Sequence, residues 1–380
     1  MKIGITCYPT YGGSGVVATE LGKTLALKGH EVHFISYAMP TRLNSFIGNI
    51  FYHEVEMYSY PLFDFPLYSI ALSSKMVEVV KFNDLDLIHA HYAIPHATSA
   101  YLAREILKKE RKKSKDIKVI TTLHGTDITL VGLEPSFLAT MKFSIEQSDG
   151  VTAVSKFLKD KTISNYNIEK DIEVIPNFID TNKYKRSSGK KTGCFRNNFA
   201  NENEKILIHV SNFRPVKRVP DVIKIFSLVR EKIASRLILV GDGPERSECE
   251  RLCRELGIME YVKFMGKQDS LPEILSIADL FFMPSQSESF GLSALEAMSC
   301  GVPVISSSVG GLPELNLHGE TGYIAEFGDV ERMAKYAVEL FSEEKKYKLF
   351  QKNARERAEF FEEDKIIGYY EKFYEKIIGK

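Results

Sequence analysis

Residues 1–36 read MKIGITCYPTYGGSGVVATELGKTLALKGHEVHFIS. This stretch contains an apolar, β-branched run at 2–8, a glycine-rich turn, a segment with helical periodicity at 15–28 and a second apolar run at 31–36. A strand, a helix and a strand in this order predict a right-handed βαβ unit with parallel strands. Because both strand runs are apolar along their whole length, we expect helices to cover both faces of the sheet.

The same alternation continues along the chain and restarts once. The first series has predicted strands at 2–8, 31–36, 50–55, 85–91, 118–124, 150–155 and 172–176, with helices at 15–28, 69–81 and 96–109. After a basic, asparagine-rich stretch, the second series has predicted strands at 206–211, 236–241, 262–266, 280–284 and 303–307. We therefore predict an α/β fold of two facing Rossmann-like, doubly wound parallel-sheet domains with an interdomain cleft, a common place for ligands.

The restart sets the predicted domain boundaries. We expect an N-terminal domain at 1–180 and a C-terminal domain at 181–360. The tail at 361–380 is rich in Tyr, Phe and Ile and predicts a helix that packs back on the N-terminal domain. The chain has 380 residues, and two domains are expected because one hydrophobic core rarely organises more than about 250–300 residues.

Composition excludes several classes of protein. Hydrophobic residues make up 44% of the chain, which excludes an intrinsically disordered protein. The 50 basic and 50 acidic side chains balance, so a nucleic-acid partner is not expected. No apolar run approaches the roughly 18 residues of a membrane span. The first residues do not resemble a signal peptide, and the five cysteines lack CxxC spacing, which together favour a reducing cytoplasm.

The glycine-rich turn GGSG at 12–15 predicts an anion-binding helix start, because glycines admit a ligand close to the backbone and the helix offers unpaired N–H groups. Residues 13–18 also match the dinucleotide fingerprint G-x-G-x-x-A. The turn is too long for that motif, and the second strand ends in Ser36-Tyr37 without an acidic residue for a ribose. Binding of an anion or an acceptor is therefore the better interpretation.

Histidines gather at two predicted strand ends. His89 and His91 share a strand face, which raises the question of a metal, but no nearby carboxylate or cysteine completes a ligand set. The DxD sequence at 84–86 precedes a buried strand and is better explained as a strand-entry turn. The motif HGTD places His124 at the carboxyl end of another strand, a position typical of functional residues in such sheets.

Two further motifs lie at strand ends of the second series. SNFRPVKR at 211–218 gathers basic groups at a strand–helix junction, an arrangement suited to a diphosphate. SESFGLSALEAMSCGVPV at 287–304 places Glu288 in a loop and Glu296 on the second turn of a helix whose first amides can meet phosphate oxygens. Carboxylates beside such a helix start are costly unless they bind polar groups such as sugar or ribose hydroxyls.

These motifs carry a resemblance to a known family. The spacing of Glu288 and Glu296, with GDGP at 241–244 and GGLPE at 310–314, resembles the retaining GT-B glycosyltransferases of family 4. The blocks ITCYPTYGGSGVVATELG, HAHYAIPHATSAYLA, TTLHGTDITLVG and VSNFRPVKRV are similar to the branch that joins N-acetylglucosamine to L-malate in bacillithiol biosynthesis. The resemblance runs over nearly the whole chain. One departure is Pro215, which stands where a basic residue is common.

The resemblance implies a retaining transfer of N-acetylglucosamine from UDP-N-acetylglucosamine to the hydroxyl of L-malate, with no metal and no cofactor. It also implies roles for individual residues. The catalytic residues would be His124 over the donor sugar, Lys217 at the diphosphate and Glu288 at the sugar hydroxyls. The donor-binding residues would be Asn212, Arg218, Phe290, Gly291, Leu292 and Glu296, the last at the ribose. The acceptor-binding residues would be Gly13, Ser14, Tyr92 and Thr122.

Three alternatives stay open. A family 4 transferase with a lipid or sugar acceptor would use the basic runs at 108–115 and 183–191 for membrane contact, which is otherwise not expected. A UDP-sugar 2-epimerase shares the architecture and the donor, but the first domain shows no set of catalytic carboxylates. A non-catalytic nucleotide-sugar sensor is disfavoured because both halves carry site-like motifs. The sequence leaves homo-oligomer formation open.

Overall fold

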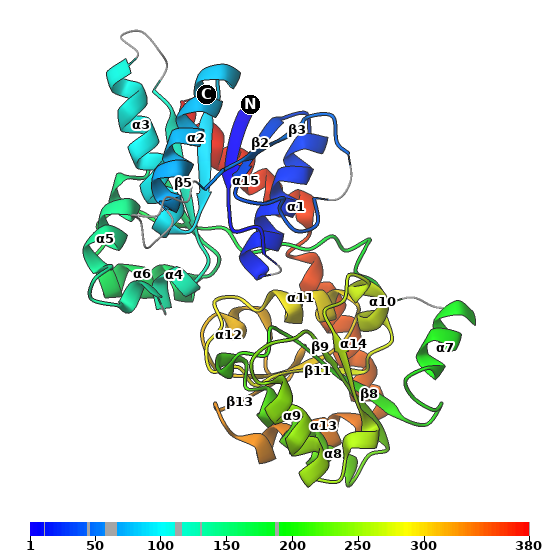
Figure 1. Ribbon diagram of the computed structural model, residues 1–380. Coiled ribbons are helices and arrows are strands. Elements are labelled where there is room, and N and C mark those ends of the chain that lie inside the picture. The colour runs from blue at the N-terminus through cyan, green and yellow to red at the C-terminus, as the bar shows by residue number, and fades with distance from the viewer. Residues whose placement is uncertain are drawn as a thin grey trace. The chain divides into compact units, whose positions relative to one another are not determined.

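The computed structural model describes residues 1–10, 12–43, 46–57, 67–110, 116–129, 131–186 and 190–379. The chain divides into two compact units (Figure 1). Unit 1 comprises Met1–Asn177 together with Asp364–Lys380, and unit 2 comprises Phe178–Glu363.

Unit 1 is built on a parallel sheet with the strand order β3-β2-β1-β4-β5-β6-β7 in the described part of the chain. Its strands are β1 (Lys2–Thr6), β2 (Glu31–Ser36), β3 (Ile50–Glu54), β4 (Leu87–His91), β5 (Lys118–Leu123), β6 (Gly150–Ala153) and β7 (Glu173–Val174). The strand order reverses between β1 and β4, and this place is called the switch point of unit 1 below. In doubly wound sheets, ligands bind outside the carboxyl ends of the strands at such a point.

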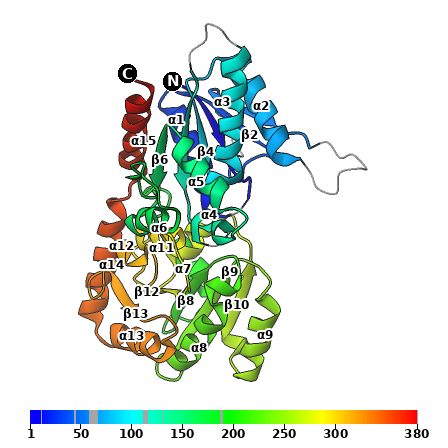
Figure 2. The ribbon, with the colours of Figure 1, turned by 90° about the vertical axis from the view of Figure 1, so that its left-hand side faces the viewer.

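Helices cover both faces of this sheet. They are α1 (Gly13–Leu27), α2 (Tyr68–Asn83), the π-helix η1 (Ala93–Ala97), α3 (Thr98–Glu110), α4 (Thr126–Thr129), the 3₁₀ helix η2 (Val131–Leu133), α5 (Leu138–Gln147), α6 (Lys156–Tyr166) and α15 (Glu363–Ile378). On one face, α2 and α3 pack together over Ile35 of β2 and Ile88 of β4 (Figure 2). On the other face, α1 packs its Gly22 against Phe34, the strand neighbour of Ile35. Successive strand residues thus point to opposite, covered faces.

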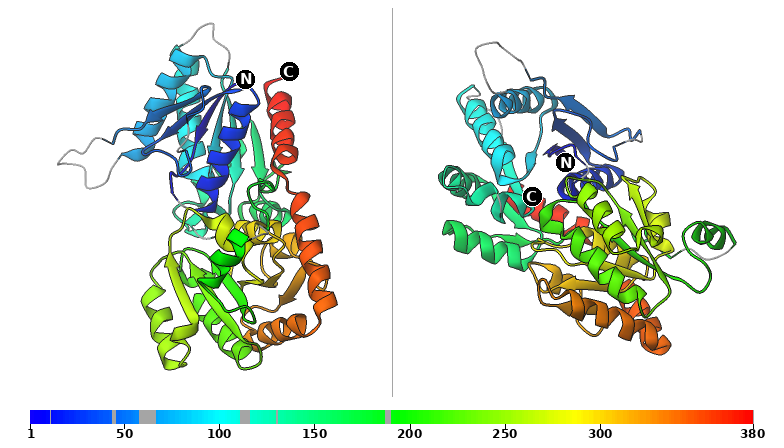
Figure 3. Two further views of the ribbon diagram at one scale, coloured as in Figure 1. Left: turned by 90° about the vertical axis from the view of Figure 1, so that its right-hand side faces the viewer. Right: turned by 60° about the horizontal axis from the view of Figure 1, so that its bottom comes forward.

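The C-terminal helix α15 belongs to unit 1 (Figure 3). The ring of Phe373 lies against Gly150 of β6, and the hydroxyl of Tyr374 lies 2.7 Å from Nδ1 of His89 on β4. Glu371 lies 2.9 Å from the ring of His30, beyond the end of α1. The aromatic face of α15 therefore covers the strands that carry the histidines.

Unit 2 repeats the plan with the strand order β10-β9-β8-β11-β12-β13 in its described residues. The strands are β8 (Lys205–Val210), β9 (Ser235–Val240), β10 (Val262–Gly266), β11 (Leu280–Met283), β12 (Val304–Ser307) and β13 (Gly322–Ala325). The order reverses between β8 and β11, which is the switch point of unit 2. Both strands are almost entirely buried, as expected for parallel strands between two layers of helices.

The helices of unit 2 are α7 (Lys190–Asn197), η3 (Pro215–Lys217), α8 (Val219–Arg230), α9 (Arg246–Glu255), η4 (Met259–Tyr261), α10 (Leu271–Ser276), α11 (Leu292–Ser299), α12 (Leu312–Leu315), α13 (Val330–Ser342) and α14 (Glu344–Glu359). A hydrophobic core of this unit joins α8, α9, α13 and α14 to the sheet. The apolar stripe of α9 includes Cys249 and Cys253, which are both buried and free. Helix α11 packs against β11 and β12.

The predicted α/β fold with two parallel sheets is confirmed, and three details differ. Several strands end one or two residues before their predicted ends, because residues such as Tyr8 and His124 leave the sheet to form loops. The helix predicted from His96 begins as α3 at Thr98, after the irregular segment η1, in which Ile94 is extended. Strand β13 was not predicted, since its short run GYIA follows directly on a glycine-rich turn. Among the described residues, no helix is long and apolar enough to cross a membrane.

Candidate functional site

The switch point of unit 1 brings together two of the predicted acceptor-binding residues. Ser14 follows β1 and Tyr92 follows β4, and the hydroxyl of Tyr92 donates to Oγ of Ser14 over 2.8 Å. The turn before Ser14 is tight, because a Cβ on Gly15 would lie 2.6 Å from the carbonyl oxygens of Tyr8 and Thr10. Tyr92 has a φ of +91°, a conformation that costs a non-glycine residue roughly 1–3 kcal/mol. The surrounding structure holds Tyr92 in this strained position.

Helix α1 begins at this same point. Gly12 is its N-cap and no side chain caps the helix, so its first amide groups, including that of Gly13, are available to a ligand. The first helical hydrogen bond runs from the Val16 N–H to the Gly12 carbonyl over 3.2 Å. Amide groups and hydroxyls at one place can bind a carboxylate without adding net charge.

His124 directly follows β5 and is held by a second histidine. Its Nε2 lies 2.8 Å from Nδ1 of His91, the last residue of β4, and the two rings are stacked. Nε2 of His91 is buried and has no hydrogen-bond partner among the described residues. Burial lowers the pKa of His124 to about 3 and lowers the pKa of His91 well below its ordinary value. Both imidazoles are therefore neutral at pH 7, and each has one N–H to donate.

Asp127 ties the loop of His124 to the loop of Tyr92. Its Oδ1 accepts the Gly125 N–H at 3.0 Å, and its Oδ2 accepts the Ala93 N–H at 3.1 Å. The side chain is 3% exposed, and burial raises its pKa to about 6. Asp127 was quoted in the HGTD motif but received no role from the sequence, although an acidic residue three positions after a strand-end histidine could have indicated one.

Thr122, the fourth residue predicted to bind the acceptor, lies inside the core. Its hydroxyl is 2.7 Å from Nε2 of His89 and 2.7 Å from the hydroxyl of Thr152. His89 in turn bonds Tyr374 of α15. Thr122 is fully buried, so its side chain belongs to a hydrogen-bond network beneath the strand ends, and only opening of that network would present it to a ligand.

The switch point of unit 2 carries an ion pair. Lys217 on η3 follows β8, Glu288 follows β11, and Nζ of Lys217 lies 2.5 Å from Oε1 of Glu288. Ser285 also donates its hydroxyl to this Oε1, at 3.2 Å. The two predicted catalytic residues of this unit are thus in direct contact although 71 positions separate them in the chain.

Two glycines of the GGLPE motif contact the backbone of Glu288. The Gly311 N–H donates to the Glu288 carbonyl over 3.0 Å. A Cβ on Gly310 would lie 1.8 Å from that same carbonyl oxygen, so only glycine fits there. The backbone of Glu288 is therefore fixed by two glycines of this motif, for which the sequence indicated no individual role.

The predicted donor residues around α11 have different surroundings. Gly291 is the N-cap of α11 and Leu292 is its first residue, so their amides lie at the free end of the helix. Phe290 is buried, and its ring packs edge-to-face on Phe361, so its side chain has a packing role. Glu296 is 4% exposed and accepts a hydrogen bond of 2.8 Å from the hydroxyl of Tyr184, which the sequence did not indicate.

The remaining predicted donor residues lie on the loop after β8. Asn212 is exposed. Nε of Arg218 donates to Oδ2 of the buried Asp221 over 2.7 Å, at the start of α8. Arg218 is half-buried and lies over the ring of Phe327. A diphosphate bound by Arg218 would therefore compete with, or share, an existing ion pair.

No group of three or more His, Cys, Asp or Glu side chains with metal-binding geometry occurs in the described ranges. The DxD sequence lies at the amino-terminal ends of the strands of unit 1. There Asp84 ends α2 in a left-handed conformation, and Oδ2 of Asp86 accepts the Lys2 N–H. The Asp86 carboxylate therefore has a local structural role, and Asp84 is the residue that ends α2.

Comparison with known proteins shows the family of this chain. The family model "Glycosyltransferase Family 4" matches residues 11–183, and the model "Glycosyl transferases group 1" matches residues 191–357. The chain is 47% identical over 379 residues to the N-acetyl-alpha-D-glucosaminyl L-malate synthase of Bacillus anthracis, covering 100% of this chain and 97% of that protein. This chain is a family 4 glycosyltransferase of the GT-B fold. The predicted resemblance is thereby confirmed.

Solved structures show the same fold. A glycosyltransferase from Rickettsia africae matches with a TM-score of 0.83 and 21% identity, covering 99% of this chain and 98% of that one. Anabaena HepE in complex with UDP and glucose matches with a TM-score of 0.80 and 22% identity, covering 98% of this chain and 99% of that one. As a family 4 glycosyltransferase, the protein is a hexosyltransferase.

Proposed function

We propose that this glycosyltransferase moves N-acetylglucosamine from UDP-N-acetylglucosamine to the hydroxyl of L-malate, the first step of bacillithiol biosynthesis. The observation that carries the proposal is the similarity along the full chain to a protein named for the same product. The arrangement of the two switch points supports it, since one offers neutral hydrogen-bond donors for a dicarboxylate and the other offers charged groups for a sugar diphosphate.

The acceptor is assigned to unit 1. The amides at the start of α1, including that of Gly13, and the hydroxyls of Ser14 and Tyr92 would bind the malate carboxylates and orient its hydroxyl. Because Tyr92 already donates to Ser14, the Ser14 hydroxyl keeps its own hydrogen for a ligand. Thr122 would act indirectly, through its hydrogen bond with His89.

The donor is assigned to unit 2. Lys217 and the first amides of α11, at Gly291 and Leu292, would bind the diphosphate. Glu288 would accept hydrogen bonds from the sugar hydroxyls, and Glu296 would accept them from the ribose. Asn212, Arg218 and the backbone of Phe290 would complete this surface. No metal and no cofactor is part of the proposal.

The transfer proposed here retains the anomeric configuration. The bond between the anomeric carbon and the diphosphate oxygen breaks as the malate oxygen bonds to that carbon on the same face. The proton of the malate hydroxyl passes to the departing diphosphate. Lys217 and the start of α11 stabilise the negative charge that develops on the diphosphate. His124, neutral at pH 7, faces the donor sugar as a hydrogen-bonding group and not as a charged acid.

A cytoplasmic location is part of the same proposal. The five cysteines are free thiols, and Cys7, Cys249, Cys253 and Cys300 are buried. A chain with this cysteine usage fits a reducing compartment.

Measurement of UDP release with a panel of acceptors tests the proposal. UDP-N-acetylglucosamine is incubated with L-malate, D-malate, other hydroxy acids, phosphatidylinositol vesicles or no acceptor. We expect UDP release to require L-malate, and the product to carry an α-linkage by NMR. Release stimulated only by lipid would show a different acceptor. Formation of the 2-epimer or of UDP without any acceptor would instead show an epimerase.

A further inference from the structure

The carboxylate of Glu296 is held from outside its own helix. Tyr184 lies in the segment that opens unit 2, before α7, and its hydroxyl donates to Oε1 of Glu296 over 2.8 Å. Both side chains are buried, with 2% of Tyr184 and 4% of Glu296 exposed. A buried carboxylate is costly without hydrogen-bond donors, so this contact both stabilises Glu296 and fixes the direction of its oxygens.

Tyr184 is itself clamped at its backbone. Its carbonyl accepts the hydroxyl of Ser299 at 2.6 Å and Nη1 of Arg355 at 3.0 Å. Nη1 of Arg355 also reaches the carbonyls of Thr181 and Ser299, at 3.1 and 2.7 Å. Ser299 is the last residue of α11, the helix that carries Glu296, so the Tyr184 ring and its carboxylate partner share one rigid support.

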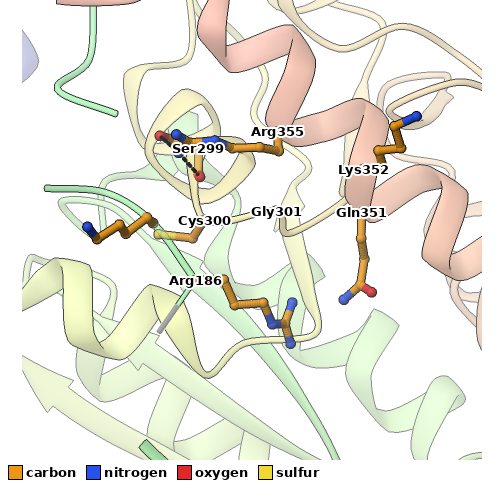
Figure 4. A pocket seen from close by; sticks show the side chains of 8 residues that line it. Arg186, Ser299, Cys300, Gly301, Gln351, Lys352 and Arg355 are labelled. Atoms are coloured by element: carbon orange, nitrogen blue, oxygen red, sulfur yellow. Dashed lines mark hydrogen bonds between the residues drawn. The ribbon is translucent and has the colours of Figure 1, made fainter. Parts of the chain in front are cut away.

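Figure 4 shows two members of this clamp, Ser299 and Arg355, from close by. Arg355 reaches from α14 to Ser299, and both residues line a pocket of about 390 Å³ at the end of α11. Because Ser299 borders a cavity, loss of its hydroxyl removes the hydrogen bond to Tyr184 without placing a large void in a packed core. The clamp can therefore be loosened without removal of the Tyr184 ring.

We propose that Tyr184 is a positioning residue for the nucleotide, which orients Glu296 toward the ribose hydroxyls of the donor. The inference rests on the proposed function, since it needs Glu296 to contact the ribose. Tyr184 does not touch the reacting atoms. Its hydroxyl bond to Oε1 fixes the orientation of the Glu296 carboxylate.

The test compares the binding of UDP and of 2′,3′-dideoxy-UDP by calorimetry. Tyr184→Phe should weaken UDP binding about three- to tenfold, the effect of one lost hydrogen bond, and leave the Kd of the dideoxy analogue unchanged. Ser299→Ala should act in the same direction with a smaller effect. In both variants the KM for UDP-N-acetylglucosamine should rise while kcat changes little.

Tyr347→Phe is the matched control. Tyr347 is a buried tyrosine of the same unit, 4% exposed, and its hydroxyl donates to the carbonyl of Asp279 over 3.0 Å. This variant should lower the melting temperature and leave the Kd of both nucleotides unchanged.

Glu296→Gln separates the two levels of the proposal. If Glu296→Gln weakens the binding of UDP but not that of the dideoxy analogue, the ribose contact is established. In that case, Tyr184→Phe variants that bind both nucleotides equally more weakly, or both unchanged, would overturn the positioning role. If Glu296→Gln itself does not distinguish the nucleotides, the assigned ribose contact is wrong and the role of Tyr184 falls with it.

Discussion

In unit 1 the loops after β1 and β4 meet through two hydroxyl groups, whereas in unit 2 the loops after β8 and β11 meet through an ammonium and a carboxylate. The hydroxyls of Tyr92 and Ser14 lie 2.8 Å apart, and Nζ of Lys217 lies 2.5 Å from Oε1 of Glu288. Both contacts occupy the same topological place in sheets of the same design. One fold therefore presents neutral chemistry at one switch point and charged chemistry at the other.

Under the proposed function, this difference corresponds to the two substrates. A dicarboxylate held by amides and hydroxyls would bring its own charge to unit 1, where His91 and His124 are neutral at pH 7. A sugar diphosphate needs a cation for the charge that develops as it leaves, and unit 2 supplies Lys217. Fold alone does not specify this assignment; the side chains at the strand ends do.

The largest expected difference between the units is in acid stability. Burial lowers the pKa of six histidines in unit 1 and of one, His209, in unit 2; the six are His33, His53, His89, His91, His96 and His124. Because of burial, each group binds a proton less strongly in the folded state than in the unfolded chain. Below pH 6.5 each therefore removes up to about 1.4 kcal/mol of stability per pH unit, until the folded pKa is reached.

Asp127 opposes this effect in unit 1. Its folded pKa of about 6 lies above its ordinary value of 3.8, so its contribution to stability improves as the pH falls through that range. One carboxyl group cannot offset six imidazoles. Hydrogen exchange at pH 7 and pH 5 should show amides of unit 1 losing protection first. Equal loss in the two units would contradict the neutral state of these histidines.

The second prediction concerns Lys217→Ala. Removal of the cation that faces the leaving diphosphate should lower kcat about a hundredfold to a thousandfold, the usual effect of losing one preorganised charge-stabilising group. Lys224→Ala is the control, because Lys224 lies 52% exposed on α8 and pairs only loosely with Asp221, at 3.7 Å. Single-turnover rates measure the effect. If Lys217→Ala kept full activity, Lys217 of unit 2 would not stabilise the departing diphosphate.

The third prediction concerns Glu288→Gln. A carboxylate that accepts from sugar hydroxyls contributes roughly 1.5–3 kcal/mol, so the variant should lose about tenfold to a hundredfold in kcat/KM. Circular dichroism and melting should barely change, because Gln can still accept from Ser285. A variant with unchanged kcat/KM would make Glu288 only the structural partner of Lys217.

The fourth prediction tests whether Ser14 and Tyr92 act as a pair. Ser14→Ala and Tyr92→Phe should each raise the KM for malate about fivefold, since each loses a hydrogen bond worth on the order of 1 kcal/mol. Because the two hydroxyls bond each other, the double variant should lose less than the sum of the single changes. Additive losses would show that the residues contact malate independently.

The sequence predicted the fold through local patterns. Apolar runs of five to seven residues and glycine-rich turns identified every strand except β13, and they placed Ser14, Tyr92, Lys217 and Glu288 at strand ends. Strand ends of a parallel sheet share one edge, so convergence of these residues could be expected within each unit.

What the sequence could not supply were contacts set by tertiary packing. The Tyr184 contact with Glu296 spans 112 positions, and the bond between His89 and Tyr374 spans 285. Neither contact leaves a periodic pattern in the sequence. The burial of Thr122 could also not be predicted. Both faces of a parallel strand are covered, so the apolar pattern does not show which face holds a buried hydrogen-bond network.

The division of substrates between the two units is tested most directly by crossed kinetics. The KM values for L-malate and for UDP-N-acetylglucosamine are measured in Ser14→Ala and in Glu296→Gln, with each substrate varied in turn. The account predicts that Ser14→Ala raises the KM for malate more than that for the nucleotide sugar, and that Glu296→Gln does the reverse. If both variants raise the KM of the same substrate, the assignment of malate to unit 1 and the donor to unit 2 is contradicted.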